Sequence, residues 1–419
     1  MSIETPGEQE ERSSGAPGAT AAAVADAPVE VKRGRAWSPG ELLRGDLGQL
    51  PVFIGLVIIV IIFQIASGGA FLLPENLSGL ADQAVSTTVL AVASVLVLLI
   101  AEIDLSLAAV AYFCGAVTGV LSVRMHWSAV PAILAGFLVG IIIGIINGFL
   151  VAVLRVPSFI VTLAGLIFYQ GALSHILQPQ TTLQIFDPSI DGIEFSSLPT
   201  YQGILIPAVV LVIYAALIVM GRVHRQRAGL PVQSATRLAL QLGLPVIAVA
   251  AVVWVFDSFQ GVPLTTIITV AVIIVIWLLT TKTSFGRHIY AVGGSAEAAR
   301  RAGIRVVGLR IAIFTLAGFL AAVAGLLIVS RGNSAPALVN PYLLLNAIAA
   351  AVIGGVSLFG GRGSVWGVVL GSLIVGSLLN GLALLNVGPD VVEMAEGLVL
   401  LAAVLVDALA RRRSFTGYR

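Results

Sequence analysis

The sequence predicts an all-α, polytopic helical membrane protein with about 10–12 transmembrane helices. Of its 419 residues, 58% are hydrophobic and 11% are charged, whereas charged residues make up about 25% of an ordinary soluble domain. The mean hydropathy is +1.03, and apolar runs of about 20 residues, the length that crosses a bilayer as a helix, recur along the chain. This composition argues against a soluble enzyme, a nucleic-acid-binding protein and a disordered scaffold.

Residues 1–49 are predicted to form a disordered cytoplasmic N-terminal tail. They contain no long apolar run, and their polar composition turns basic at Lys32, Arg33 and Arg35, as is typical of disordered segments. The first apolar run begins only near Leu50, so a cleavable signal peptide of ordinary length is not expected. The basic residues just before this run favour a cytoplasmic N-terminus.

The apolar runs predict a transmembrane permease domain over residues 50–410, followed by a basic cytoplasmic C-terminal tail over 411–419. Several runs are short or interrupted by glycine, so some of them are expected to be re-entrant or broken rather than complete crossings. The twelve candidate spans are 50–67, 84–101, 106–123, 129–154, 157–176, 203–221, 239–256, 263–281, 308–330, 343–357, 364–386 and 390–409.

Basic residues are distributed unevenly between the two sides of this layout. If the chain starts inside and changes side at each span, all but two of its 23 lysine and arginine residues lie on the inner side, and the exceptions are Arg124 and Arg331. The positive-inside rule assigns that side to the cytoplasm, so both termini are predicted to be cytoplasmic. The longest outer loop, 177–202, is polar and is expected to be either a landing surface for an external partner or a solvated loop.

No catalytic or metal-binding constellation stands out in the sequence. Cys114 is the only cysteine, and the four histidines are scattered, so neither an internal disulfide nor a metal site is expected. The segment from Gly355 to Arg362 approaches a phosphate-binding loop in its glycine spacing, but it lacks the Lys-Ser/Thr pair that contacts phosphates and magnesium. We therefore expect no cofactor in this chain, with ATP and Mg²⁺ bound by a partner subunit.

Two carboxylates, Glu102 and Asp104, precede Ser106 between two apolar runs. An acidic residue at the bilayer centre costs about 2.5–3.5 kcal/mol on the insertion scale, so such residues usually face a cavity or find partners. Asp104 is positioned to cap a helix that begins at Leu105. Two interpretations stay open: a broken helix whose polar ends line a translocation pathway, and a structural cap near the cytoplasmic interface.

A short surface helix is predicted in the largest inner loop. Ser295 is a favourable N-cap and Gly303 a favourable C-terminal stop. Between them, Glu297 is spaced to pair with the two arginines three and four positions later, and two alanines give the helix a small, smooth face. It is either a docking helix for a cytoplasmic motor subunit or an ordinary loop helix. The candidate docking residues are Ser295, Glu297, Ala298, Ala299, Arg300 and Gly303.

Amide side chains inside the spans are further candidates for a pathway. Such groups often hydrogen-bond across helix interfaces, and a neutral polyhydroxylated substrate would also need amide and hydroxyl partners. Gln170 is favoured for the second role, because Tyr169 beside it offers a ring for stacking. With the acidic motif, the candidate pathway residues are Glu102, Asp104, Ser106, Asn147, Gln170, Asn346 and Asn380.

The glycine-rich stretch 353–364 lies between two candidate spans. Small residues allow helices to approach closely and allow a span to break. We therefore expect a hinge or re-entrant turn there, with tight helix packing as the alternative.

Four segments carry a family resemblance: Ala101–Ser106, Val156–Gly165 with Gly171 following, Thr283–Arg300 and Val352–Ser364. In these segments the chain resembles the permease subunits of bacterial monosaccharide ABC importers, the ribose/xylose type, over about residues 50–410. The resemblance is closest to xylose permeases, which share the additional hydrophobic pair between about 239 and 281.

This resemblance implies the fold of an ABC importer permease that works as a homodimer in the bacterial cytoplasmic membrane. It implies a cytoplasmic ATP-binding subunit docked below, and an extracytoplasmic sugar-binding protein above that delivers a monosaccharide, expected to be xylose. The helix from Ser295 to Gly303 would be the coupling helix, since Glu297 to Arg300 match the family pattern, whereas Arg301 departs from it. The lipid bilayer is the expected surrounding, and no nucleic-acid partner is expected.

Other functions stay open at this point. The same class of importer could carry a nucleoside or another small polar solute. An ion-coupled secondary transporter would need its own coupling site, for which Glu102 with Asp104, and Glu393 with Glu396, are candidate pairs. A membrane anchor or assembly protein without transport is a third reading.

Overall fold

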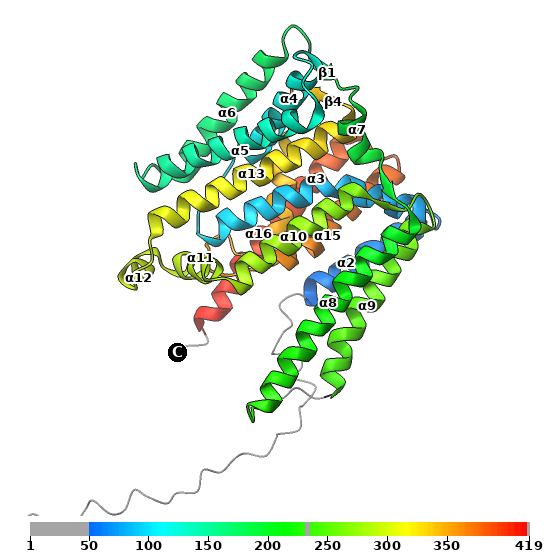
Figure 1. Cartoon of the computed structure of the whole chain (residues 1–419), viewed down its shortest axis with the longest axis vertical. Helices are drawn as coiled ribbons and strands as arrows, with labels where there is room; N and C mark the ends of the chain where they lie inside the picture. Colours follow the sequence, from blue (N-terminus) through cyan, green and yellow to red (C-terminus); the bar gives the residue numbers. More distant parts are fainter. Residues whose placement is uncertain (1–49, 231–234, 417–419) are drawn as a thin grey trace, which may run out of the picture. The chain divides into compact units, whose positions relative to one another are not determined.

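The computed structural model describes residues 50–230 and 235–416 and is helical throughout this part, apart from four short strands (Figure 1). Each of the twelve candidate spans coincides with a helix, which confirms the all-α membrane class. These helices are α2 (Leu50–Ala66), α3 (Pro74–Leu99), α4 (Leu107–Val123), α5 (Ala129–Ala152), α6 (Ser158–Leu177), α8 (Thr200–Arg227), α9 (Ala235–Asp257), α10 (Leu264–Lys282), α13 (Val306–Gly332), α14 (Pro341–Ile353), α15 (Val365–Leu384) and α16 (Pro389–Thr416).

Eight helices of the described part have the length and apolarity of a complete crossing, and α2, α4 and α14 provide shorter apolar helices. The predicted tail 1–49 lies outside the described residues. At the other end, α16 continues through Thr416, past the predicted boundary at 410.

One candidate span begins earlier than expected, and the outer loop contains regular structure that the sequence analysis did not specify. Helix α3 begins at Pro74 and not at 84, because its polar first turns have partners: the Asn76 side chain donates to the Phe71 carbonyl at 2.8 Å. The outer loop 177–202 contains β1 (Thr182–Gln184), α7 (Pro188–Phe195) and β2 (Ser197–Leu198). The start of α7 carries a recognisable signal, since Asp187 accepts the Ser189 N–H at 2.9 Å and a proline follows it.

Helix α13 lies at the centre of the packing, in contact with α3, α4 and α5 (Figure 1). Glycines permit this approach. A Cβ at Gly115 of α4 would lie 2.7 Å from the Gly325 carbonyl oxygen of α13, and one at Gly144 of α5 would meet the backbone of Phe314. Small residues at such crossings let membrane helices gain van der Waals contact along their backbones.

The four strands join segments that the sequence places on the outer side. β1 pairs antiparallel with β4 (Ser334–Pro336), and β2 pairs with β3 (Val262–Pro263). At the opposite end, the Gly361 N–H donates to the Leu99 carbonyl at 2.9 Å, which joins the predicted inner connection between α14 and α15 to the inner end of α3. Each of these contacts therefore joins segments that the alternation of spans places on the same side of the membrane.

The two arginines that break the positive-inside pattern both have structural partners. Arg124 donates to the carbonyls of Ile176 and Leu177 at 2.8 and 2.6 Å, at the end of α6. Arg331 donates to the Asp82 carbonyl at 3.2 Å. Cations near the last carbonyls of a helix are favourable, so the Arg124 side chain caps the C-terminus of α6.

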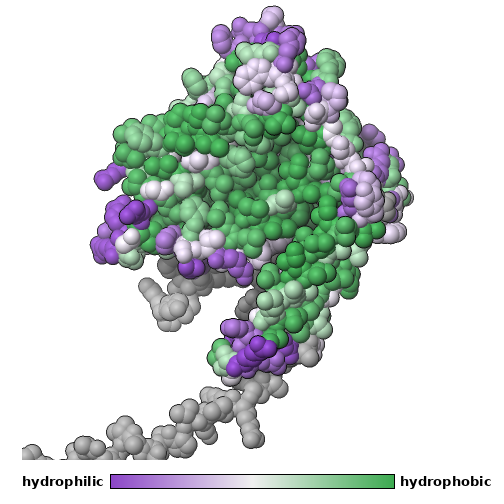
Figure 2. All heavy atoms as spheres, viewed as in Figure 1, coloured by the Kyte–Doolittle hydropathy of each residue, from purple (hydrophilic) through white to green (hydrophobic). Residues whose placement is uncertain are grey.

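The surface is apolar between the helix ends. Figure 2 shows hydrophobic residues over most of the visible face, with hydrophilic residues gathered at its margins. Helices α8 and α9 pack on each other, and within their apolar windows 6% and 0% of the residues are buried. Such exposure of apolar helices suits a hydrocarbon surrounding.

Candidate functional site

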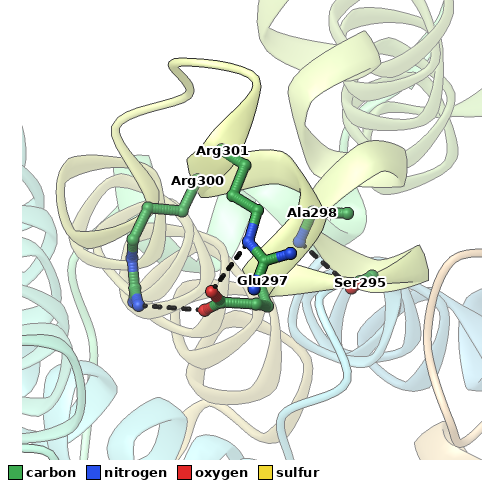
Figure 3. Close-up of polar contacts among 5 residues, drawn as sticks. All are labelled: Ser295, Glu297, Ala298, Arg300 and Arg301. Carbon is green, nitrogen blue, oxygen red and sulfur yellow. Dashed lines mark hydrogen bonds and ion pairs between the residues drawn. The ribbon is translucent and has the colours of Figure 1, made fainter.

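The predicted short helix is present as α12 (Ala296–Arg301) (Figure 3). The Ser295 hydroxyl accepts the Ala298 N–H at 3.2 Å, as expected for an N-cap. The helix ends at Arg301 with Ala302 as its C-cap, and Gly303 follows with φ +85°, a left-handed conformation that favours glycine. Both sequence signals for this helix are confirmed.

The charges of α12 pair with one another on its exposed face. Glu297 lies 3.4 Å from Arg300 and 3.2 Å from Arg301, and all three side chains are at least 59% exposed (Figure 3). Exposed ion pairs contribute little to stability, so these charges can exchange partners. The two alanines separate, because Ala298 is exposed whereas Ala299 is 4% exposed and joins the core. The smooth alanine face expected from the sequence therefore points partly inward.

A second short helix, α11 (Ser284–Gly294), precedes α12 and was missed in the sequence. Its signal was present, since the Thr283 hydroxyl accepts the Gly286 N–H at 3.2 Å as an N-cap. The Tyr290 hydroxyl donates to the Gly363 carbonyl at 3.0 Å. Helix α11 thus joins α12 to the glycine-rich turn between α14 and α15.

That turn, predicted as a hinge or a re-entrant turn, packs tightly against neighbouring backbone. Gly360, Gly361 and Gly363 all have positive φ angles. A Cβ at Gly360 would lie 2.7 Å from the Ala101 Cβ, so a larger residue does not fit beside the end of α3. The alternative of close packing accounts for these glycines.

The segment 102–106 is a polar connection between four helices. Glu102 forms an ion pair with Arg310 of α13 at 2.9 Å. Asp104 Oδ1 accepts from the Ser106 N–H at 2.8 Å and from its hydroxyl at 2.6 Å. Asn147 of α5 donates to the same hydroxyl at 3.3 Å.

The expected cap at Asp104 needs correction, because α4 begins at Leu107 and Ser106 occupies the N-cap position without a side-chain bond to the helix. Asp104 instead holds the backbone just before the helix. A buried carboxylate that accepts two hydrogen bonds is a satisfied structural group. Whether this segment also lines a pathway stays a prediction.

A cavity brings together the acidic motif and the short helix. It is lined by Glu102, by Arg300 of α12, and by two arginines that the sequence analysis missed, Arg155 and Arg310. The distances along the chain between these residues explain why no motif indicated them.

The four amide side chains do not meet in one place. Gln170 donates to the Ala337 carbonyl at 3.0 Å and accepts the Val339 N–H at 3.1 Å. Tyr169, expected to offer a stacking ring, is 8% exposed and packs against Phe113. Asn147 is the one amide that lies with the acidic motif.

The other two amides also bond across helix interfaces. Asn346 donates to Glu396 of α16 at 2.8 Å, and Asn380 accepts from Asn76 of α3 at 2.9 Å. These contacts match the simpler interpretation of polar groups in membrane helices. Their role in a pathway stays a prediction.

At the outer end, α7 presents a carboxylate to α13 that sequence reasoning did not single out. Glu194 lies 3.9 Å from Arg331, and its backbone N–H donates to Ser330 at 2.9 Å. Burial and then the neighbouring carboxylate of Asp82 raise the pKa of Glu194 to about 7, against the lowering effect of Arg331. At this distance Arg331 does not offset the loss of water around the carboxylate.

Comparison with known proteins covers most of the chain. Residues 76–405 match the family model described as "Branched-chain amino acid transport system / permease component". The xylose transport system permease protein XylH of Escherichia coli (strain K12) is 37% identical over 370 residues, which are 87% of this chain and 94% of that protein. The ribose import permease protein RbsC of Bacillus subtilis (strain 168) is 33% identical over 363 residues, 87% of this chain and 94% of its own length.

A third similar protein is named as a permease for a different sugar, L-arabinose. The L-arabinose transport system permease protein AraH of Escherichia coli (strain K12) is 31% identical over 383 residues, 91% of this chain and 94% of that protein. No solved structure matches the chain.

Proposed function

The chain belongs to the family of branched-chain amino acid transport system permease components, and on that premise we propose that it is the membrane-spanning permease subunit of an ATP-driven importer of xylose. The observation that carries the proposal is the 37% identity to a xylose permease over 94% of that protein's length. The family description names branched-chain amino acids, but the similar relatives named above are all sugar permeases, so we propose a monosaccharide cargo.

In this proposal the chain carries out no catalysis. A cytoplasmic ATP-binding subunit binds and hydrolyses ATP with Mg²⁺, and an extracytoplasmic sugar-binding protein delivers the sugar. Two copies of the chain would form the translocation path between them, in the bacterial cytoplasmic membrane with both termini in the cytoplasm. The basic inner connections support this orientation.

Helix α12 is the proposed contact with the ATP-binding subunit. Its support is its exposed charged face, its N-cap at Ser295 and its position directly before α13. A capped helix moves as a unit, and only residues 302–305 separate it from a 27-residue helix at the centre of the packing. Movement of the motor subunit would thereby reach the core and open the path to one side.

The ion-coupled alternative is weaker because the candidate coupling carboxylates have protein partners. Glu102 forms an ion pair with Arg310. Asp104 accepts a hydrogen bond from the Ser106 hydroxyl, and Glu396 accepts one from the Asn346 amide. A coupling carboxylate must bind and release its ion during the cycle. Uptake that collapses with a protonophore while ATP is held constant would favour that alternative.

The cargo is tested by initial-rate uptake of labelled xylose in cells with and without this chain. Unlabelled ribose, galactose and glucose serve as competitors, and uridine tests the nucleoside alternative. We expect saturable xylose uptake that disappears on deletion and competes weakly with the other compounds. Unchanged xylose uptake after deletion would remove xylose as the cargo.

The docking role of α12 is tested by the charge reversal Glu297→Arg. This change removes both ion pairs of the exposed face, so we expect sugar-stimulated ATPase activity of the reconstituted complex to fall about tenfold or more, since close interfacial charge pairs are worth at least about 1.5 kcal/mol. The matched control is Glu75→Arg, which alters an exposed acidic residue in the first turn of α3 at the opposite end of the helices. Intact ATPase stimulation in Glu297→Arg would contradict the docking assignment.

A further inference from the structure

A cavity of about 380 Å³ opens beside α12, where the end of α5 and the start of α6 meet the start of α13. Four charged side chains line it: Glu102, Arg155, Arg300 and Arg310. The remaining wall is apolar. Three arginines and one glutamate line the cavity, and Arg300 also pairs with Glu297 outside it, so one positive charge remains in surplus and favours an anion.

The arginines keep unused hydrogen-bond donors. Arg310 uses one terminal nitrogen on Glu102, while its Nε is buried and has no hydrogen-bond partner among residues 50–230 and 235–416. Buried donors are normally satisfied, and an unsatisfied one calls for an explanation such as a ligand. Within the described part of the chain, Arg155 has neither a hydrogen bond nor an ion pair from its side chain, although it lines the same cavity.

The start of α13 adds a third source of positive potential. Val306 and Val307, its first residues, line the cavity, and the helix begins without a side-chain cap. The Val306 N–H donates to the Ile304 carbonyl at 2.9 Å, whereas the N–H groups of Val307 and Gly308 lack, among the described residues, the side-chain acceptor that often satisfies the start of a helix. The positive end of a helix favours bound anions, phosphate groups above all.

The backbone at Arg155 points to a role for its side chain. Arg155 has φ +59°, in the left-handed region, just after the end of α5. Glycine or asparagine is the usual residue at such a helix end, because either tolerates this conformation with less strain. Arg155 carries that strain, and it also lines the cavity.

We propose that this cavity binds a phosphate group. Guanidinium groups match phosphate oxygens with paired, charge-assisted hydrogen bonds, and the cavity is wide enough for a phosphate and the group attached to it. The phosphate has two possible sources, the headgroup of an anionic lipid and a soluble phosphate compound. Because Arg300 belongs to α12, an occupied cavity holds that helix against α5 and α13. Binding itself does not depend on the transport function proposed above.

The test measures binding to the purified full-length chain in two arms. In the first, the chain in phosphatidylcholine nanodiscs is titrated into inorganic phosphate, and broadening of the ³¹P resonance reports binding. In the second, native mass spectrometry counts phosphatidylglycerol molecules that stay bound to the chain after mixed-lipid nanodiscs are dissolved. The variants are Arg155→Gln, Arg310→Gln and, as a matched control, Arg301→Gln. Arg301 shares α12 and the Glu297 ion pair with Arg300 but does not line the cavity.

We expect saturable binding in at least one arm, weakened about tenfold by Arg155→Gln and by Arg310→Gln, since a hydrogen bond to a charged group is worth about 1.5–3 kcal/mol. Arg301→Gln should bind as the unaltered chain does. Binding in the first arm alone identifies a soluble phosphate compound, and binding in the second alone identifies a lipid headgroup. Arg155 is exposed, so Arg155→Gln keeps the test valid if loss of the Glu102 ion pair disturbs folding of Arg310→Gln. No binding in either arm, or equal binding by Arg155→Gln and Arg301→Gln, overturns the proposal.

Discussion

Substituting alanine for Gly148 should separate α5 from α13 and destabilise the protein. A Cβ at Gly148 would lie 2.8 Å from Ile311 Cα and 3.2 Å from Phe314 Cβ, whereas ordinary van der Waals contact begins near 3.4 Å. The nearest atom belongs to the backbone, so no side-chain rotation relieves the clash. The two helices must move apart by about 0.6 Å at this crossing, and close-packed interiors transmit such shifts to their neighbours.

The size of the effect follows from two opposing terms. Overpacking of a well-packed interior costs about 1–3 kcal/mol, and replacing a helical glycine by alanine contributes about 1 kcal/mol in the other direction. The difference is a net loss of about 0–2 kcal/mol, and the 2.8 Å contact with a backbone atom places Gly148→Ala toward the upper end of that range. Gly221 of α8 provides the matched control, because a Cβ placed there would have no atom within 4 Å. Gly221→Ala should therefore stabilise by up to about 1 kcal/mol.

The chain contains its own reporter for this measurement. Cys114 is the only cysteine, and it is 1% exposed within α4, so a fluorogenic maleimide reacts with it only when the helices separate. We expect the midpoint temperature to fall by about 2–5 °C for Gly148→Ala and to rise slightly for Gly221→Ala. A shift of the same sign in both variants would refute the packing argument. Cys114→Ser supplies the background signal.

Two further predictions follow from the charges and caps. The folded pKa of Glu194 is about 7, above the ordinary 4.5, so the folded state binds this proton more tightly and loses stability as pH rises from about 4.5 through 7. Between about pH 5 and pH 8 the midpoint temperature of the unaltered chain should fall more than that of Glu194→Gln, and parallel profiles would contradict this. Ser295→Ala removes the N-cap of α12 at a local cost of about 0.5–2 kcal/mol, so hydrogen exchange of the Ala298 amide should speed up. Ser295→Asp should retain protection.

Local signals in the sequence predicted the structure well, and contacts between distant residues escaped prediction. Ser295 and Gly303 delimit α12 because capping depends on a few neighbouring residues. The Glu102–Arg310 ion pair joins the connection after α3 to α13, and nothing in either local sequence indicates the other. Nothing in the sequence singled out Glu194 either, since its raised pKa depends on burial and on the neighbouring carboxylate of Asp82.

The amide side chains show a second limit on what the sequence can predict. Gln170 and its companions were recognised as polar groups in apolar helices, but residue type alone does not say whether such a group bonds to another helix or to a solute. The structure gives Gln170 a donor and an acceptor from the chain itself. A sugar would have to compete with those contacts, so a buried donor without a partner among the described residues, such as Arg310 Nε, is a better indication of a ligand than a satisfied amide.

The contacts between connections also constrain how the chain crosses the membrane. β1 with β4, and β2 with β3, each join segments separated by an even number of the candidate spans, and so does the bond from Gly361 to Leu99. If one intervening span failed to cross, each affected pair would have to meet across about 30 Å of hydrocarbon, which no hydrogen bond can do. The alternation read from the basic residues and the pairing of the strands rest on independent physics, charge in one case and backbone hydrogen bonding in the other. Their agreement argues that none of the eight candidate spans between Leu99 and Gly361 fails to cross alone, so any re-entrant segments among them occur in pairs.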